Sequence, residues 1–434
     1  MLNYINAYLL FPLLEKVNKR EIHSKLRELK EFEKLSRVEQ KKIQKNKLFE
    51  MLVYCKAEIP FYNNLFKKHS FDPDKVLKDT KYLLDLPILT KDIVRENSTQ
   101  LRLPSAVHER KTGGSTGQSV FFYYDSYGLD WTSAINLQAY DMAYNFKHKK
   151  DCHISSELGI VPPSFKAKFL DWLKLFSQNR SRLMINSFSE KDLEKTLKQL
   201  KRIRPYLLQG HPSSAYAIAE FIKSNNGSPS KYCAVFEPSG EMLTPKIIKS
   251  LEENLGCKVV NRYGNAEFGV IAHSLFNDPP ERLKIFERAF FVEETNGSEM
   301  IITNFTNKGM PLIRYNTGDI ATVKEESNGR FIYSIQGRIH DIVNINGEEY
   351  ATHYIMDYLD HKIRGVREFQ IIILNEELPI LNIVPENLND VLRIESEVKA
   401  RWPKGLSVKF INFSDLEKVG WREKFRHVID RRSR

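Results

Sequence analysis

The sequence predicts an α/β protein with a large N-terminal domain built mostly on parallel sheets, a β-rich subdomain and a small α+β C-terminal domain. Strand, turn and helix patterns alternate between about residues 193 and 260, which is typical of a parallel sheet. Hairpin patterns follow from residue 286 onward, with a turn expected at Asn296-Gly297. A chain of 434 residues also exceeds what one hydrophobic core usually supports, so more than one domain is expected.

Composition and charge narrow the class of protein. Hydrophobic residues make up 41% of the chain and charged residues 28%, as in ordinary globular proteins. The net charge of +11 is dispersed and comes with no zinc-finger spacing, basic recognition helix or aromatic RNA-binding motif, which disfavours nucleic-acid binding. The basic surplus better suits an anionic small molecule such as a nucleotide, or an acidic membrane surface.

The cysteines and the N-terminal segment favour a cytoplasmic protein. The four cysteines lie far apart and form no C-x-x-C pair, as expected for reduced thiols. No apolar run reaches the ~18 residues needed to span a bilayer, and the segment from Met1 to Leu14 lacks the features of a signal peptide. That segment could lie in a membrane interface as an amphipathic helix, but packing onto its own domain is the stronger expectation.

The elements of the N-terminal region follow from periodicity and caps. Helical spacing runs from Pro12 to Cys55, and Thr90 and Ser189 resemble helix N-caps. A strand at 120–124 and a helix at 125–143 precede three strand candidates at 206–208, 234–236 and 257–260, which alternate with helices at 189–203, 215–222 and 245–255. Sheets of this kind bind ligands at the carboxyl ends of their strands.

The β-rich subdomain is expected to contain strands at 290–293 and 299–302 and to end in the segment 311–319. A domain boundary is placed near Arg338. Beyond it lie Asn346-Gly347, a helix near 355–359, a strand at 370–374 and a basic tail.

A glycine-rich run extends from Lys111 to Gln118. Glycine lets backbone N–H groups approach an anion, and Ser115 and Thr116 add hydroxyl donors. The run lacks the glycine spacing and the lysine of a Walker loop. By itself it fits a phosphate-binding loop and a surface turn about equally well.

Four segments in chain order carry a resemblance to a known family: TGGSTG at 112–117, RYGNAE at 262–267, IRYNTGD at 313–319 and GRIHD at 337–341. Together they resemble adenylate-forming acyl ligases, most closely the phenylacetate-CoA ligase-like branch that includes CapK-type proteins of polysaccharide biosynthesis. The resemblance covers about residues 48–428. It implies an N-terminal domain at 1–336 that binds ATP and acid, and a small mobile domain at 337–434 that carries the catalytic lysine.

The resemblance implies a role in nucleotide binding for several residues. Asp319 would bind the ribose hydroxyls, and Arg338 would act near the ribose and phosphate. A carboxylate suits a ribose diol because it accepts two hydrogen bonds. The ATP triphosphate would be held by Thr112, Gly113, Gly114, Ser115, Thr116 and Gly117. A loop beside the adenine is matched, more weakly, by Ser239, Gly240 and Glu241.

The resemblance also implies the catalytic groups. Tyr263 and Gly264 match the segment that stacks near adenine, and Glu267 matches its magnesium-linked carboxylate. Lys424, in a Lys-Phe-Arg ending, would serve the adenylation step. Attack of a carboxylate on the α-phosphorus brings two anions together, so a metal ion and a lysine are needed to offset the charge. His211 and Tyr263 would border the acyl pocket.

Each assignment has a plainer alternative, and the motifs depart from the family in places. Glu267 could be a surface acid, Asp319 a turn residue, Arg338 an ion-pair partner and Lys424 part of a solvated tail.

Two residues depart from the family motifs. Glu423 replaces the usual glycine before the lysine, and His340 replaces the usual first acid after the Gly-Arg pair. His211 could equally be a structural histidine. Relatives often carry a Cys/His metal cluster after the Tyr-Gly segment. No cysteine follows Cys257 here, so structural zinc is not expected.

The chain is therefore predicted to be an ATP- and magnesium-dependent ligase that forms an acyl-AMP and passes the acyl group to a thiol, such as coenzyme A or a carrier, or to an amine. Aromatic residues near the pocket would suit an aryl acid, whereas the CapK likeness points to an amino acid or a sugar acid of surface polysaccharide. One alternative is an adenylyltransferase that leaves AMP on its substrate. Another is a non-catalytic nucleotide-binding scaffold of a polysaccharide assembly complex.

Overall fold

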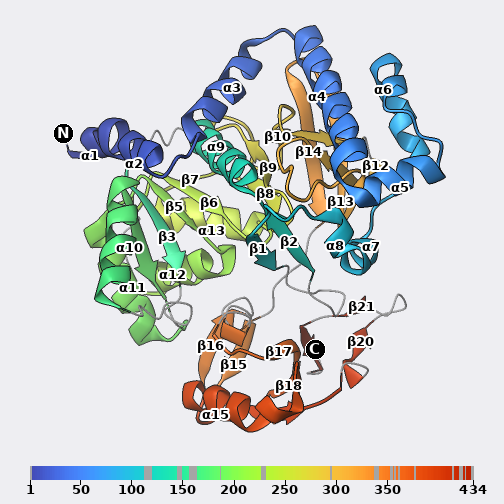
Figure 1. Ribbon diagram of the computed structural model, residues 1–434. Coiled ribbons are helices and arrows are strands. Elements are labelled where there is room, and N and C mark those ends of the chain that lie inside the picture. Colours follow the sequence, from blue (N-terminus) through green and yellow to red (C-terminus); the bar gives the residue numbers. More distant parts are fainter. Residues whose placement is uncertain are drawn as a thin grey trace.

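The protein was analysed as a computed structural model (Figure 1). It describes the chain except residues 1, 112–119, 144–148, 156–163, 186, 226–230, 294–295, 337–341, 352–354, 356–357, 360–361, 376–377, 413–414, 420–423, 426 and 432–434. Within the described part, none of the helices combines the length and the apolarity required to cross a bilayer.

Helices dominate the first hundred residues, as the periodicity predicted. Ser36 caps α4 and forms a capping box with Glu39, so both side chains satisfy free N–H groups at the helix start. Pro60 begins α5 at a position where its missing N–H costs nothing. The elements are α1 (Leu2–Ile5), η1 (Asn6–Leu10), α2 (Phe11–Val17), α3 (Ile22–Lys34), α4 (Arg37–Glu58), α5 (Pro60–Lys68), α6 (Asp74–Lys78), η2 (Thr80–Asp85), α7 (Lys91–Glu96) and α8 (Ser98–Leu101).

A five-stranded parallel sheet, in the order β4-β3-β5-β6-β7, confirms the predicted α/β core. Ser189 and Thr244 cap α11 and α13 as predicted. Apolar side chains of α11, α12 and α13 cover one face of the sheet. The strands are β3 (Asp151–Ser155), β4 (Arg180–Met184), β5 (Leu207–Gly210), β6 (Val235–Pro238) and β7 (Lys258–Val259). The helices are α9 (Ser126–Met142), α10 (Phe165–Ser177), α11 (Glu190–Ile203), α12 (Pro212–Ser224) and α13 (Pro245–Leu255).

The larger sheet is antiparallel and has seven strands in the order β11-β12-β13-β14-β10-β9-β8. One expectation is corrected here. Asn296 begins β12 instead of forming the hairpin turn, and residues 262–265 form β8. The sheet packs against α4, α5 and α9 in the largest apolar cluster. Its strands are β8 (Arg262–Asn265), β9 (Gly269–Ser274), β10 (Leu283–Ile285), β11 (Phe290–Val292), β12 (Asn296–Asn304), β13 (Tyr315–Glu326) and β14 (Gly329–Gln336), while β1 (His108–Lys111) and β2 (Phe121–Tyr124) pair separately.

The C-terminal elements have an apolar cluster of their own and lie at the bottom of Figure 1. Asn346 and Gly347 have positive φ and connect the hairpin of β15 and β16, as expected for an Asn-Gly turn. A four-stranded sheet follows in the order β19-β18-β17-β22. These elements are β15 (Ile342–Ile345), β16 (Glu348–Ala351), β17 (Val366–Ile373), β18 (Ile380–Pro385), η4 (Leu388–Asp390), α15 (Val391–Arg401), β19 (Ser407–Phe410), β20 (Lys418–Val419), β21 (Lys424–Phe425) and β22 (Val428–Asp430).

Candidate active site

The loops at the carboxyl ends of β5 and β6 bring one group of predicted residues together. The N–H of Ser239 donates to the carbonyl of Gly210 at 2.9 Å, which holds the two loops side by side. Gly240 has φ +74°, and a Cβ there would lie 2.8 Å from Cε1 of His211. Both the backbone angle and the close approach therefore require glycine. Oε1 of Glu241 lies 3.7 Å from Nδ1 of His211.

A second group joins two motifs that are far apart in the sequence. The hydroxyl of Tyr263 on β8 donates to Oδ2 of Asp319 on β13 at 2.7 Å. Burial and the neighbouring Asp319 carboxylate raise the pKa of Tyr263 well above its ordinary value, so the phenol stays protonated and donates at neutral pH. A Cβ on Gly264 would lie 2.4 Å from the carbonyl oxygen of Gly269. Glycine at 264 thus allows β8 to pair closely with β9.

Glu267 lies in the connection from β8 to β9 and is 3% exposed. Its Oε1 accepts a hydrogen bond from the Tyr315 hydroxyl at 3.1 Å and lies 3.6 Å from Nζ of Lys91. Lys91 begins α7, which is fixed because the N–H of Leu89 donates to the carbonyl of Arg314 at 2.9 Å. Among the described residues no hydrogen bond is made to Oε2 of Glu267. The plainer interpretation of Glu267 as a surface acid is wrong, because the carboxylate is buried.

A buried ion pair connects the two groups. Glu237, on β6 just before Ser239, accepts hydrogen bonds from Arg262 at 2.9 Å and from Gln209 at 2.5 Å, and lies 3.3 Å from Nε2 of His273. Burial by itself would raise the pKa of Glu237, but the charge of Arg262 and the bonds from His273 and Gln209 outweigh it and lower the pKa to about 2. The carboxylate is therefore ionised at neutral pH, and it ties β6 to the start of β8.

Other predicted residues lie outside the described part of the chain. They are the glycine-rich loop from Thr112 to Gly117, Arg338, and the two residues that differ from the family motifs, His340 and Glu423. For Lys424 the backbone alone is described, in β21, where it pairs with Val419 of β20. The roles assigned to these residues remain predictions.

Sequence reasoning missed several polar residues around the site. Lys91 and Tyr315 contact Glu267, and Glu237 and Arg262 connect its two groups. One signal was available, since Glu237 is a charge directly after the apolar run Ala234–Phe236 of a predicted strand. A charge in such a strand needs a partner. Nothing in the sequence around Lys91 indicates that it contacts Glu267.

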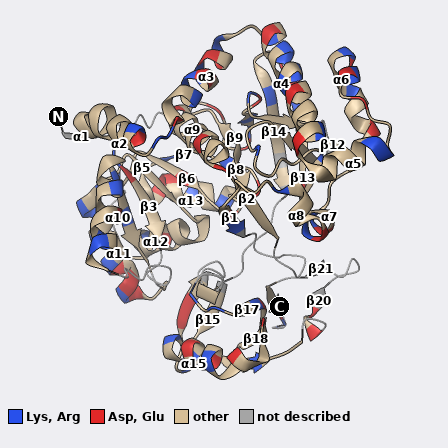
Figure 2. Cartoon of the chain, viewed as in Figure 1, with Lys and Arg blue, Asp and Glu red and all other residues tan. Residues whose placement is uncertain are grey.

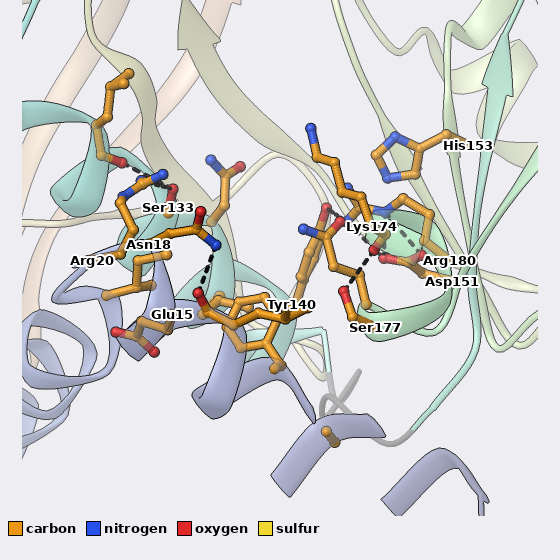
Figure 3. Close-up of a pocket in the computed structure, with 18 of the residues that line it drawn as sticks. Glu15, Asn18, Arg20, Ser133, Tyr140, Asp151, His153, Lys174, Ser177 and Arg180 are labelled. Carbon is orange, nitrogen blue, oxygen red and sulfur yellow. Dashed lines mark hydrogen bonds and ion pairs between the residues drawn. The ribbon is translucent and has the colours of Figure 1, made fainter. Parts of the chain in front are cut away.

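A cavity of about 900 Å³ lies beside this region, between α2, α9, α10 and the sheet face not covered by α11–α13. Figure 3 shows Asp151, His153 and Arg180 at one side of it and Glu15, Asn18 and Arg20 at the other. It begins at the amino ends of β3 and β4, away from His211 and Glu241. Its wall nevertheless includes Gln209 and Arg262, which directly precede Gly210 and Tyr263.

The strand register explains the polarity of this cavity. Arg182, His153, Gln209 and Glu237 are paired in turn across β4, β3, β5 and β6, so their side chains share one sheet face. Burial and the nearby Arg180 lower the pKa of His153 well below its ordinary value, which keeps its imidazole neutral. Arg180 binds Asp151 through both carboxylate oxygens and donates to the Tyr140 hydroxyl at 3.0 Å.

The fold is that of the adenylate-forming ligases. A solved structure of 2-hydroxyisobutyryl-CoA ligase, in complex with 2-HIB-AMP and CoA in the thioesterification state, superposes with a TM-score of 0.59 at 17% identity and covers 91% of this chain and 90% of its own. A second structure of that ligase, in the postadenylation state, gives a TM-score of 0.57 at 16% identity, with 92% and 91% covered.

Sequence comparison identifies the branch within that class. Protein CapK of Staphylococcus aureus is 26% identical over 339 residues, which cover 75% of this chain and 74% of CapK. The phenylacetate-coenzyme A ligase of Thermus thermophilus is 24% identical over 344 residues, with 73% and 74% covered. A comparison with protein-family profiles gave no match. The chain is thus similar in sequence to CapK and to phenylacetate-CoA ligases and shares the fold of adenylate-forming ligases, in agreement with the resemblance carried by its four motifs.

Proposed function

We propose that the protein activates a carboxylic acid with ATP, as an acyl-AMP, and passes the acyl group to a thiol such as coenzyme A or a carrier, or to an amine. The observation that carries this proposal is the hydrogen bond from Tyr263 to Asp319. It brings together two motifs that the resemblance assigned to one nucleotide site. The structural relatives are described as complexes with an acyl adenylate and coenzyme A, which supports the same chemistry.

In this proposal Asp319 accepts the ribose hydroxyls while Tyr263 holds its carboxylate in place. The loop Thr112–Gly117 binds the triphosphate, and Arg338 lies near the ribose and phosphate. Residues 1–336 form the ATP- and acid-binding domain. Residues 337–434 form a small domain that brings Lys424 to the α-phosphate.

Magnesium fits the environment of Glu267. Mg²⁺ is commonly held by one or two carboxylates together with substrate phosphates. Oε1 of Glu267 is engaged by Tyr315 and Lys91, which orients Oε2 as the oxygen for the metal. When bound, the ion would offset charge on the phosphates during attack, and Lys91 would add positive charge beside it.

The polar cavity favours an amino acid or a sugar acid over an aryl acid. Its wall carries His153, Gln209 and Arg262, which could bind hydroxyl or amino groups of such a substrate. Gln209 and Arg262 already bind Glu237, but Nε2 of His153 is buried and has no hydrogen-bond partner among the described residues. An aryl ring would leave this nitrogen without water or a partner, which is costly. The CapK relative supports a role in surface polysaccharide biosynthesis. A cytoplasmic location belongs to the same proposal, and a peripheral contact with a membrane would be separate from the ligase activity.

Pyrophosphate exchange with ATP and magnesium, across a panel of aryl, amino and sugar acids, tests this function. Exchange is expected with a polar acid and is expected to be lost in Asp319→Ala, while the control Asp85→Ala, at an exposed residue, keeps it. The absence of exchange with every acid, together with no ATP binding, would contradict the ligase. AMP retained on the product would indicate the adenylyltransferase. ATP binding without any turnover would favour the non-catalytic scaffold.

A further inference from the structure

Helix α10 is apolar yet barely buried. All of its residues, Phe165–Ser177, are described, and only Ser177 is buried. Phe165 is 87% exposed, and Phe169 and Trp172 are each more than half exposed. These three residues follow one another at i, i+4 and i+7 and so share one face of the helix. An amphipathic helix normally packs such a face against the protein.

The N-terminal helical segment α1–η1–α2 shows the same feature. Its exposed apolar residues are Tyr4, Ile5, Tyr8, Leu9, Leu13 and Val17. Asn6 and Ala7 of η1 are buried. The segment thus packs onto its own domain by one side, as the sequence favoured, and leaves most of its large apolar side chains in solvent.

The N-terminal segment and α10 touch at Asn6 and Phe176, and their exposed apolar residues are together named the apolar face here. Nδ2 of Asn6 donates to the carbonyl of Phe176 at 2.8 Å, and Nδ2 of Asn179 donates to the carbonyl of Asn3 at 3.0 Å. Figure 1 shows both helices at the same edge of the molecule. The apolar face is larger than the scattered exposed residues that need no explanation.

Charge around the apolar face is positive. Lys166 and Lys168 on α10, and Lys16 and Lys19 at the end of α2, are exposed, and none of them pairs with an acid among the described residues. The acids within these helices are already paired: Asp171 with Arg182 at 2.6 Å, and Glu15 with His23. Figure 2 shows α1 without charged residues and Lys/Arg positions along α10.

We propose that the apolar face binds the surface of an anionic lipid membrane. Tyr, Trp and Phe side chains with an apolar body are suited to the headgroup region, and helices lying in the interface insert their apolar side by ~5–10 Å. The surrounding lysines are attracted to anionic headgroups. The proposal is independent of the ligase activity, since the face contains none of the residues of the nucleotide site.

Flotation of the full chain with vesicles tests this, comparing phosphatidylcholine alone with phosphatidylcholine plus phosphatidylglycerol. Binding is expected with the anionic vesicles and is expected to weaken with salt. Lys166→Gln and Lys168→Gln should each weaken it roughly fivefold, whereas Lys195→Gln on α11 should not. Leu9→Ser with Trp172→Ser should abolish binding. Leu392→Ser should leave binding intact, although this α15 residue is more exposed than either face residue.

Fluorescence gives a second measurement. Trp172 emission should shift to shorter wavelength on the anionic vesicles. Trp172→Phe should retain binding and lose the shift. Equal binding by the face variants and the wild type would overturn the proposal. Failure of the wild type to bind anionic vesicles would also overturn the proposal. If the wild type is instead a dimer that Leu9→Ser with Trp172→Ser disperses, the apolar face binds a second copy of the chain.

Discussion

The Tyr263 hydroxyl donates a 2.7 Å hydrogen bond to Asp319, although β8 and β13 are not neighbours in the antiparallel sheet. The bond fixes one carboxylate oxygen of Asp319 and leaves the other side of the carboxylate for a ligand. Tyr263 is therefore a positioning residue for the proposed ribose-binding acid.

Tyr263→Phe should raise the KM for ATP roughly tenfold and change kcat little, because a hydrogen bond to a charged group contributes about 1.5–3 kcal/mol. The measurement is pyrophosphate exchange at varied ATP. Tyr82→Phe, on an exposed side chain, serves as the control. An unchanged KM for ATP would indicate that Asp319 does not bind the nucleotide.

Glu267→Gln should reduce exchange about a hundredfold and increase the magnesium concentration needed for half-maximal rate, because the variant loses a charged metal ligand. Tyr315→Phe should raise the same magnesium requirement only slightly, since it removes one hydrogen bond to Oε1. Magnesium titration of the exchange rate measures both. If the two variants show the wild-type magnesium dependence, Glu267 does not hold the metal.

Lys424→Ala should lower exchange by roughly a hundredfold or more, the size seen when a single group that stabilises transition-state charge is removed. ATP binding, followed by calorimetry, should change far less. Lys418→Ala on the paired strand β20 is the matched control. Full exchange by Lys424→Ala would assign this residue to the solvated tail.

Gly240→Ala should destabilise the fold by more than Gly318→Ala. Both glycines have nearly the same positive φ, +74° and +75°, so each alanine bears a strain of roughly 1–3 kcal/mol. A Cβ at 240 would also meet His211, whereas nothing lies within 4 Å at 318. Urea unfolding measures the difference, and His211→Ala should remove most of it. Equal destabilisation by the two alanines would argue against close packing of His211.

Glu237 should make the stability of the protein pH-dependent in acid. Its pKa is about 2 in the fold and 4.5 ordinarily, so its contribution is fully present above pH 4.5 and is lost as the pH falls toward 2. The loss amounts to roughly 3 kcal/mol. Glu237→Gln should be less stable at neutral pH, since the partly buried Arg262 loses its charged partner. The stability of the variant should fall less steeply between pH 4.5 and 2. Urea unfolding across this range measures the slope, with Glu253→Gln on the surface as the control.

Much of the local structure could be predicted from sequence. Caps such as Ser189 and Thr244, the Asn346-Gly347 turn and the strand patterns depend on neighbours within a few residues. The prediction of a turn at Asn296-Gly297 was wrong, because pairing with β13 extends β12 through Asn296. Pairing between strands outweighs the local turn preference here. The N-terminal segment was recognised as amphipathic and α10 was not, and no local pattern shows whether an apolar face is covered.

The sequence by itself determined the class of protein, because the four motifs keep their residues and order without reference to any contact. Only the tertiary structure decided which of those residues meet. The curl of the antiparallel sheet brings Tyr263 to Asp319, and the strand register places Glu237 against Arg262. It also buries Glu267 next to Lys91, a contact between residues 176 positions apart (267 − 91). Such contacts depend on how whole sheets twist and stack, and no local stretch of sequence encodes that geometry.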